Sequence, residues 1–298
     1  KSSLLSSRVE SGHPDLAATS TNRLEFDEFL EPTTMNLSQF FLRTITALAI
    51  GPIVLVIIWA GYPYFSIFII VVSYLMLIEM LLIIKSDNFG KLYLFIPMVM
   101  TLVLLLFVIK YQVPYLISLL ITIGFFLCLL VGKDSFANKL ITGFSFLYIL
   151  LFSICILLLR ELPTFGALGL FWFFAVNWAS DIGAYCFGKC FGRSKMFPRI
   201  SPGKTWIGSF GGIFTAVLVG SLFYGSLFKG LDLEAFVLVC AGISIVGQLG
   251  DLIESIFKRR FGVKESGVLL PGHGGVLDRM DSVLLTAPFV YILLLMYS

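Results

Sequence analysis

The sequence predicts an all-α integral membrane protein, a polytopic fold with about nine transmembrane helices. Hydrophobic residues make up 58% of the 298 residues and charged residues only 13%, whereas about a quarter of the residues in soluble domains are charged. Apolar runs of about 18 residues or more recur along the chain, and each can cross a hydrocarbon core of about 30 Å as a helix. These observations exclude a single large soluble core as the fold class.

Residues 1–38 differ from the rest of the chain because they are polar and rich in Ser, Thr and acidic side chains. They lack the apolar core of a cleavable signal peptide, so we expect a mobile or peripheral tail without an assigned function. Residues 39–298 are expected to form one transmembrane helical domain, with its catalytic part in 170–298.

Nine apolar runs separated by short polar breaks are the predicted spans. The breaks are too short to hold a soluble domain, and no internal repeat is visible, which weakens a secondary-transporter interpretation without excluding it. The expected spans are roughly 40–60, 64–84, 92–109, 113–131, 140–159, 166–187, 206–228, 234–257 and 276–297.

The basic residues predict the orientation of these spans. With nine crossings, 18 of the 21 Lys and Arg residues fall on the side of the N-terminus, and only Lys110, Arg160 and Lys229 fall on the other. Because cytoplasmic loops accumulate basic residues, we expect a cytoplasmic N-terminus and a C-terminus on the opposite side. The net charge of only +3 says nothing about nucleic acid. The expected surrounding is the lipid bilayer, and we expect no nucleic-acid partner.

The stretch 250–282 holds five acidic and five basic residues between two apolar runs. Such a density of charge is costly in a membrane protein unless it holds ions or charged ligands. At the end of the eighth span, Asp251, Glu254, Ser255 and Lys258 are spaced to share one face of a helix. This stretch is therefore predicted to contain the active site.

Asp278 and Asp281 open the ninth span three residues apart, so they are neighbours on the helix surface. Grouped with Asp251, they would repel unless protonated or bridged, and a hard divalent cation prefers such oxygen ligands. We predict that Asp251 and Asp278 ligate a divalent metal, Mg²⁺ or Mn²⁺. The alternatives are an ion pair with a neighbouring Lys or Arg for Asp251 and, for Asp281, capping of the helix or support of a metal ligand without contact to the metal.

A glycine-rich turn, Pro271 to Gly275, connects these two helices. Such a turn brings backbone close to a ligand and can point amide groups at an anion, so Gly272, Gly274 and Gly275 are predicted to contact substrate. His273 is predicted to donate to a phosphate, with a catalytic base or a structural hydrogen bond as the alternatives. The basic residues expected to offset substrate charge here are Lys258, Arg259, Lys264 and Arg279.

Asn177, Asp181 and Tyr185 are spaced four residues apart along the sixth span. Polar residues on one stripe of a membrane helix favour a polar cavity, so Asn177 and Asp181 are predicted to bind substrate. Hydrogen bonding between helices is the alternative interpretation.

The loop 191–206 that follows is basic and contains a GKT sequence. It is not a P-loop, because Pro198 stands where that motif needs a glycine. We predict that Ser201, Lys204 and Thr205 hold phosphate oxygens. The alternative is a loop whose basic residues only set the orientation of the spans in the membrane.

Four motifs within about the last 125 residues resemble those of the phosphatidate cytidylyltransferase family, also called CDP-diacylglycerol synthases. Two positions depart from the usual pattern, since Ile207 and Glu265 stand where Glu and Asp are common. The motifs are NWASDIGAY (177–185), SPGKTW (201–206), GDLIES (250–255), and S-x-x-K-R with K-E-S-G and PGHGGVLDRMD (255–281).

This resemblance implies the reaction of CTP with phosphatidic acid to give CDP-diacylglycerol and pyrophosphate for phospholipid biosynthesis. It implies metal-assisted in-line nucleotidyl transfer at the cytosolic membrane face, with Mg²⁺ held by Asp251 and Asp278 and a second cation such as K⁺ at the same polar site. The implied location is a bacterial inner membrane, and a homodimer remains an option. The residues expected to take part in catalysis are Asp251, Asp278, Lys258, His273 and Asp281.

Three other functions stay open. A CTP-using lipid kinase would release CDP rather than pyrophosphate and would need a base for a hydroxyl nucleophile. A relative acting on an archaeal ether-linked phosphatidate would use the same chemistry. An anion transporter would place its charges near the bilayer midplane, whereas these charges are predicted at the cytosolic face.

Overall fold

The computed structural model describes residues 51–84, 95–108, 121–128 and 135–297, except for 164, 199, 229, 268 and 270–273. Residues Arg43–Ser298 form one compact unit. The predicted tail, 1–38, lies outside the described residues.

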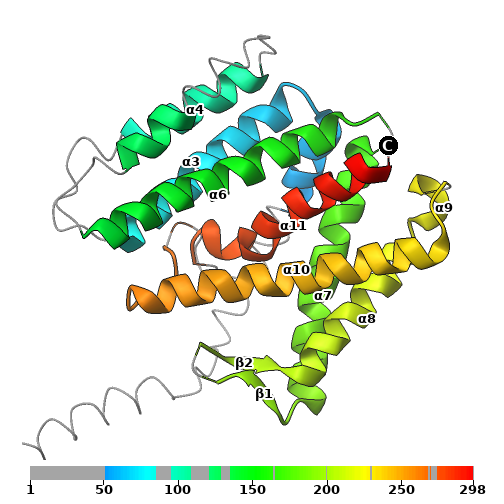
Figure 1. The fold of residues 1–298 in the computed structure, drawn as a ribbon. Helices are drawn as coiled ribbons and strands as arrows, with labels where there is room; N and C mark the ends of the chain where they lie inside the picture. The colour runs from blue at the N-terminus through cyan, green and yellow to red at the C-terminus, as the bar shows by residue number, and fades with distance from the viewer. Residues whose placement is uncertain are drawn as a thin grey trace, which may run out of the picture. The chain divides into compact units, whose positions relative to one another are not determined.

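The described chain is mostly helical (Figure 1). A short apolar helix, Gly51–Ala60, comes first, and residues 121–128 are also helical. The remaining elements are α3 (Tyr64–Ile84), α4 (Phe95–Val108), α6 (Phe136–Glu161), α7 (Gly166–Phe191), β1 (Lys195–Phe197), β2 (Ser201–Thr205), α8 (Trp206–Ser221), α9 (Tyr224–Leu227), α10 (Leu233–Arg260) and α11 (Leu277–Tyr297).

Four of the described helices, α3, α6, α10 and α11, are long and apolar enough to cross a membrane. Each coincides to within a few residues with a predicted span, and α3 has the same bounds as its prediction. Two shorter apolar helices, Gly51–Ala60 and Trp206–Ser221, fall within the first and seventh predicted spans. The membrane-protein fold class is thus supported, but the count of about nine spans is not confirmed.

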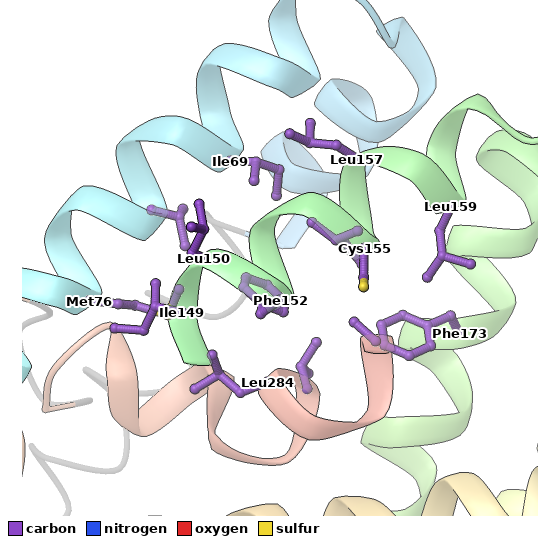
Figure 2. Packing of buried hydrophobic residues seen from close by; sticks show 14 of the residues in the cluster. Ile69, Met76, Ile149, Leu150, Phe152, Cys155, Leu157, Leu159, Phe173 and Leu284 are labelled. Atoms are coloured by element: carbon purple, nitrogen blue, oxygen red, sulfur yellow. The ribbon is translucent and has the colours of Figure 1, made fainter. Parts of the chain in front are cut away.

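The helix α6 is central to the apolar core because it packs against α3, α4, α7 and α11. Figure 2 shows Ile149 and Phe152 of α6 near Met76 of α3 and Leu284 of α11. All four of these side chains are buried. The core therefore joins the N-terminal helices to α11, whose first turn carries the predicted acidic residues.

Helices α7 and α8 pack with their backbones very close together. A Cβ atom at Gly212 would lie 2.8 Å from the carbonyl oxygen of Ser180, and one at Gly208 would lie 2.6 Å from that of Ala184. Thr215 also donates from α8 to the carbonyl of Ala179, at 2.8 Å. Small residues permit such contacts between membrane helices, so this pair forms a firm support for the hairpin between them.

That hairpin corrects the prediction of a loop at 191–206, within a fold that is otherwise helical. Strands β1 and β2 pair antiparallel, with Lys195 opposite Thr205 and Phe197 opposite Ser201. Thr205 ends β2 and caps α8, because its hydroxyl accepts from the amide of Gly208 at 3.1 Å. The basic loop is thus an ordered element that runs directly into α8.

Candidate active site

Lys204 links the hairpin to α10. Its ammonium lies 2.8 Å from Oδ2 of Asp251, and it donates to the carbonyl of Gln248 at 3.2 Å. The Lys204 and Asp251 side chains retain 22% and 36% of their exposure. The structure therefore brings together two predicted site residues and leaves them accessible to a ligand.

Asp251 has a second partner on its own helix. The hydroxyl of Ser255 donates to Oδ1 of Asp251 at 3.3 Å. The predicted shared face of α10 is thus present. The pair with Lys204 is the arrangement that the sequence left as the alternative to metal ligation.

Lys258 forms the more buried charge cluster of the site. Its ammonium lies 2.7 Å from Oδ1 of Asp278 on α11 and 3.0 Å from Oε1 of Glu254 on its own helix. The side chains of Lys258, Glu254 and Asp278 are only 12%, 5% and 9% exposed. The contact with Glu254 is close enough for an ion pair but lacks hydrogen-bond alignment, since neither Glu254 oxygen has a hydrogen-bond partner among the described residues.

Asp278 also organises the backbone around the predicted glycine turn. Its Oδ2 accepts from the amides of Ser266 at 2.9 Å and Gly275 at 3.0 Å. Gly274 has φ of +82°, and a Cβ atom there would lie 2.8 Å from the same oxygen. The amide of Gly275 is thus used by a protein carboxylate rather than left for a substrate anion, while Gly272 and His273 lie outside the described residues.

Three aspartates gather where α7, α10 and α11 meet. The charges of Asp181, Asp251 and Asp281 are within electrostatic reach of one another. Ser282 links two of them, because its amide donates to Asp281 at 2.7 Å and its hydroxyl donates to Asp181 at 3.4 Å. Stretches of sequence about a hundred residues apart therefore form one acidic cluster.

Some predicted substrate contacts have structural partners instead. Asn177 is 2% exposed, donates to the carbonyl of Phe173 at 2.8 Å and accepts from Thr286 at 3.1 Å. This is the interhelical hydrogen bonding that the sequence left as the alternative. Thr205 is the buried cap of α8. Their roles in substrate binding stay predictions.

Three further basic residues were predicted in the site, Arg259 in α10, Lys264 just after it and Arg279 in α11. Arg259 donates to the carbonyls of Val263 at 3.2 Å and Ile200 at 3.5 Å, so it connects α10 to the turn of the hairpin. Lys264 and Arg279 are exposed, and Ser201 is half-buried in β2.

The two predicted metal ligands, Asp251 and Asp278, have protein partners in this structure. Asp251 and Asp278 are held by different lysines, and both oxygens of Asp278 have protein donors. Within the described ranges, no three His, Cys, Asp or Glu side chains are arranged to hold a metal ion. Metal ligation by this pair remains a prediction.

Comparison with known sequences decides the family. A model of the cytidylyltransferase family matches residues 41–297. The chain belongs to the cytidylyltransferase family. Proteins named phosphatidate cytidylyltransferase are similar to this family member, and the one from Brucella suis biovar 1 is 36% identical over 262 residues, 84% of this chain and 91% of that protein.

Other relatives match a shorter part of this cytidylyltransferase-family chain. The phosphatidate cytidylyltransferase of Bacillus subtilis is 43% identical over 140 residues, 47% of this chain and 52% of that protein. That of Staphylococcus epidermidis is 48% identical over 122 residues, 41% of this chain and 47% of that protein. The chain thus spans about half the length of these two relatives in the matched regions.

Several residues of the cytidylyltransferase-family site were not predicted as site residues. Ser266 and Ser282 accompany the predicted aspartates, and Gln248 joins Lys204 to α8 through its contacts with Ser209. Single serines in a membrane protein carry little signal on their own. Glu79 carries a stronger signal, because it is an acidic residue inside an apolar run, and the sequence allows it either to line the same polar cavity or to extend to the membrane interface.

Proposed function

We propose that the chain transfers the cytidylyl group of CTP to phosphatidic acid, giving CDP-diacylglycerol and pyrophosphate. Membership of the cytidylyltransferase family and the names of the similar bacterial proteins support this reaction. The observation that carries the proposal is the meeting of three separate polar stretches, 177–185, 201–206 and 250–282. They meet through Lys204 with Asp251, Asp181 with Ser282, and Lys258 with Asp278.

The reaction joins two anions, so its main requirement is charge compensation and alignment. An oxygen of the phosphatidate phosphate attacks the α-phosphorus of CTP, while the bond from that phosphorus to the bridging oxygen breaks and pyrophosphate leaves. A phosphomonoester has a second pKa of about 6, so the nucleophile is largely ionised at neutral pH without a strong base.

Two lysines of the site are proposed to have different roles, because one is accessible and the other is buried. Lys204 is accessible, and its ammonium can exchange from Asp251 to an incoming phosphate. Lys258 is enclosed between two carboxylates, and its role is to hold Asp278 and the start of α11 in place. Arg259 and Lys264, near the end of α10, are proposed to offset the negative charge of the substrates.

A divalent cation, Mg²⁺ or Mn²⁺, would supply positive charge that stabilises the departing pyrophosphate. Asp251 would be a ligand of this ion because its side chain is 36% exposed and the charges of Asp181 and Asp281 are within electrostatic reach, although the described carboxylates are not arranged as a group of three around an ion. Substrate oxygens and water would complete the coordination of such an ion. Asp278 would join the ligands only by releasing Lys258. We also propose a second cation such as K⁺. Replacing K⁺ by choline in the turnover assay tests this part of the proposal.

The proposed setting is a bacterial inner membrane, with the active site and the N-terminus on the cytosolic side and the C-terminus on the other. The uneven distribution of Lys and Arg supports this orientation. Cysteine labelling of single-cysteine variants in intact cells would test it, since labelling at the C-terminus only after permeabilisation would contradict the proposal.

The decisive experiment identifies both products. Purified protein is incubated with CTP labelled in the base or in the γ-phosphate, phosphatidic acid and Mg²⁺, with and without chelator. We expect labelled CDP-diacylglycerol and labelled pyrophosphate, both lost with chelator. Release of CDP and a phosphorylated lipid would instead identify a lipid kinase, and the absence of any turnover with phosphatidic acid would refute the proposal.

A second candidate function, anion transport, gains no support from a specific observation. The charged residues of the described site gather at one end of α10 and at the start of α11.

A further inference from the structure

Glu79 is a buried carboxylate on α3 that the proposed reaction does not use. The residue is only 4% exposed. It accepts hydrogen bonds from the hydroxyl of Ser266 at 2.9 Å and from the amides of Val276 at 2.9 Å and Leu277 at 2.8 Å. Within the part of the chain that the structure describes, none of the ion pairs includes Glu79.

These three donors explain why a carboxylate is tolerated in an apolar helix. Amides at the start of a helix have no partner within that helix, and the positive end of the helix dipole favours a negative charge there. Val276 and Leu277 are at the start of α11. Glu79 therefore caps α11 from a different helix, which satisfies both the amides and its own charge.

Glu79 and Asp278 together hold both ends of the connection between α10 and α11. Glu79 binds the side chain of Ser266 and the amides of Val276 and Leu277, while Asp278 binds the amides of Ser266 and Gly275. We call these two carboxylates and their five donors the loop clasp. Its contacts fix the start of α11 against α3 on one side and, through Lys258, against α10 on the other.

The glycines around the clasp agree with this arrangement. A Cβ atom at Gly267 would lie 3.1 Å from Oε1 of Glu79, and one at Gly275 would overlap Oε2 of Glu79 and the hydroxyl of Ser266. Glycine at 275 is thus required by the approach of a carboxylate from α3. The position of the glycine motif and the position of Glu79 depend on each other.

We propose that Glu79 is a positioning residue for cytidylyl transfer, acting through the loop clasp on Asp278 and Lys258 without touching substrate. This inference rests on the proposed function. Displacement of reacting groups by about 1 Å can cost about 100-fold in rate, and loss of Glu79 frees one side of the clasp. The expected effect is therefore on turnover more than on nucleotide affinity.

The test compares Glu79→Gln, Ser266→Ala and the double variant with the unaltered protein. Glutamine has the same shape but only one acceptor oxygen, and its NH₂ group would face donors. Ser73→Ala is the matched control, because Ser73 is also buried on α3 and its hydrogen bonds among the described residues go to Ile69 and to Ser153 of α6, not to α11. Each variant is assayed for kcat, KM for CTP, thermal unfolding in detergent, and hydrogen exchange in the peptide 275–282.

We expect Glu79→Gln to lower kcat by about 10- to 100-fold, to leave KM for CTP within about threefold, and to speed amide exchange at Val276 and Leu277. Ser266→Ala should lower kcat less, and adding it to Glu79→Gln should cost little more, because both remove the same contact. Ser73→Ala should keep kcat and the exchange rate.

Hydrogen exchange separates failure of this inference from failure of the proposed function, because it needs no turnover. If the unaltered protein makes no CDP-diacylglycerol but Glu79→Gln still accelerates exchange, the proposed reaction is refuted and the loop clasp is retained. Unchanged exchange, or an unchanged kcat in an active enzyme, would overturn the positioning role. A fall in unfolding temperature with normal kcat would overturn it as well, since Glu79 would then serve stability alone.

Discussion

Replacing Lys258 by methionine should destabilise the protein by about 3–5 kcal/mol, the usual cost of leaving buried charges without their partner. Lys258, Glu254 and Asp278 are at most 12% exposed, and with all three groups ionised their formal net charge is −1. Methionine keeps the length of the side chain but leaves two buried carboxylates with a net charge of −2. At about 2–4 °C per kcal/mol for a chain of this size class, the unfolding temperature should fall on the order of 10 °C.

Lys204→Met is the matched comparison, because the same substitution is made in a more exposed pair. Lys204 and Asp251 are 22% and 36% exposed, and exposed ion pairs contribute about 0–1 kcal/mol. We expect a shift of no more than a few degrees in unfolding temperature, with a large loss of kcat/KM. Both proteins are unfolded in the same detergent without CTP, with tryptophan fluorescence as the signal.

The double variant Lys258→Met with Glu254→Gln provides the internal check. It returns the net charge of the cluster to −1, so it should recover part of the lost stability. Equal losses of unfolding temperature in the Lys204 and Lys258 variants would refute the argument from burial. So would a double variant that is less stable than Lys258→Met alone.

Three further results are expected. Asp278→Asn should abolish turnover while the protein stays folded in detergent, and near-normal turnover would contradict the role given to this carboxylate. Chelation should stop CDP-diacylglycerol formation and added Mg²⁺ or Mn²⁺ should restore it; turnover that persists after exhaustive chelation would disprove the metal proposal. Thr205→Ala should cost about 1 kcal/mol of stability through loss of the α8 cap, whereas Thr205→Ser should cost much less; equal losses in calorimetry would count against the capping role.

The sequence predicts the four long apolar helices of the described chain well, because their hydrophobic runs are long and uninterrupted. The bounds of α3 agree with the prediction, and those of α10 and α11 differ by three residues or fewer. The hairpin was missed because β1 has only three residues and β2, Ser201–Thr205, contains both a proline and a glycine. Neither strand shows the alternation of polar and apolar residues that marks a half-buried strand.

The candidate site was predictable as a set of residues but not as a set of pairs. Helical spacing predicts that Asp251 and Ser255 share a face, and they are hydrogen-bonded. Spacing cannot predict that Lys204 faces Asp251, because this contact depends on the packing of α8 against α10. For the same reason, nothing in the local sequence predicts that Glu79 meets the start of α11, 197 residues away.

The loop clasp makes the attachment of α11 independent of the chain that leads to it. Ser266 on one side and Gly275 to Leu277 on the other are each anchored by hydrogen bonds to carboxylates. A cut in the peptide chain between these anchors would therefore leave both new ends tethered. The property that follows is that α11 should keep its position after a nick in this connection, whatever the nick does to turnover.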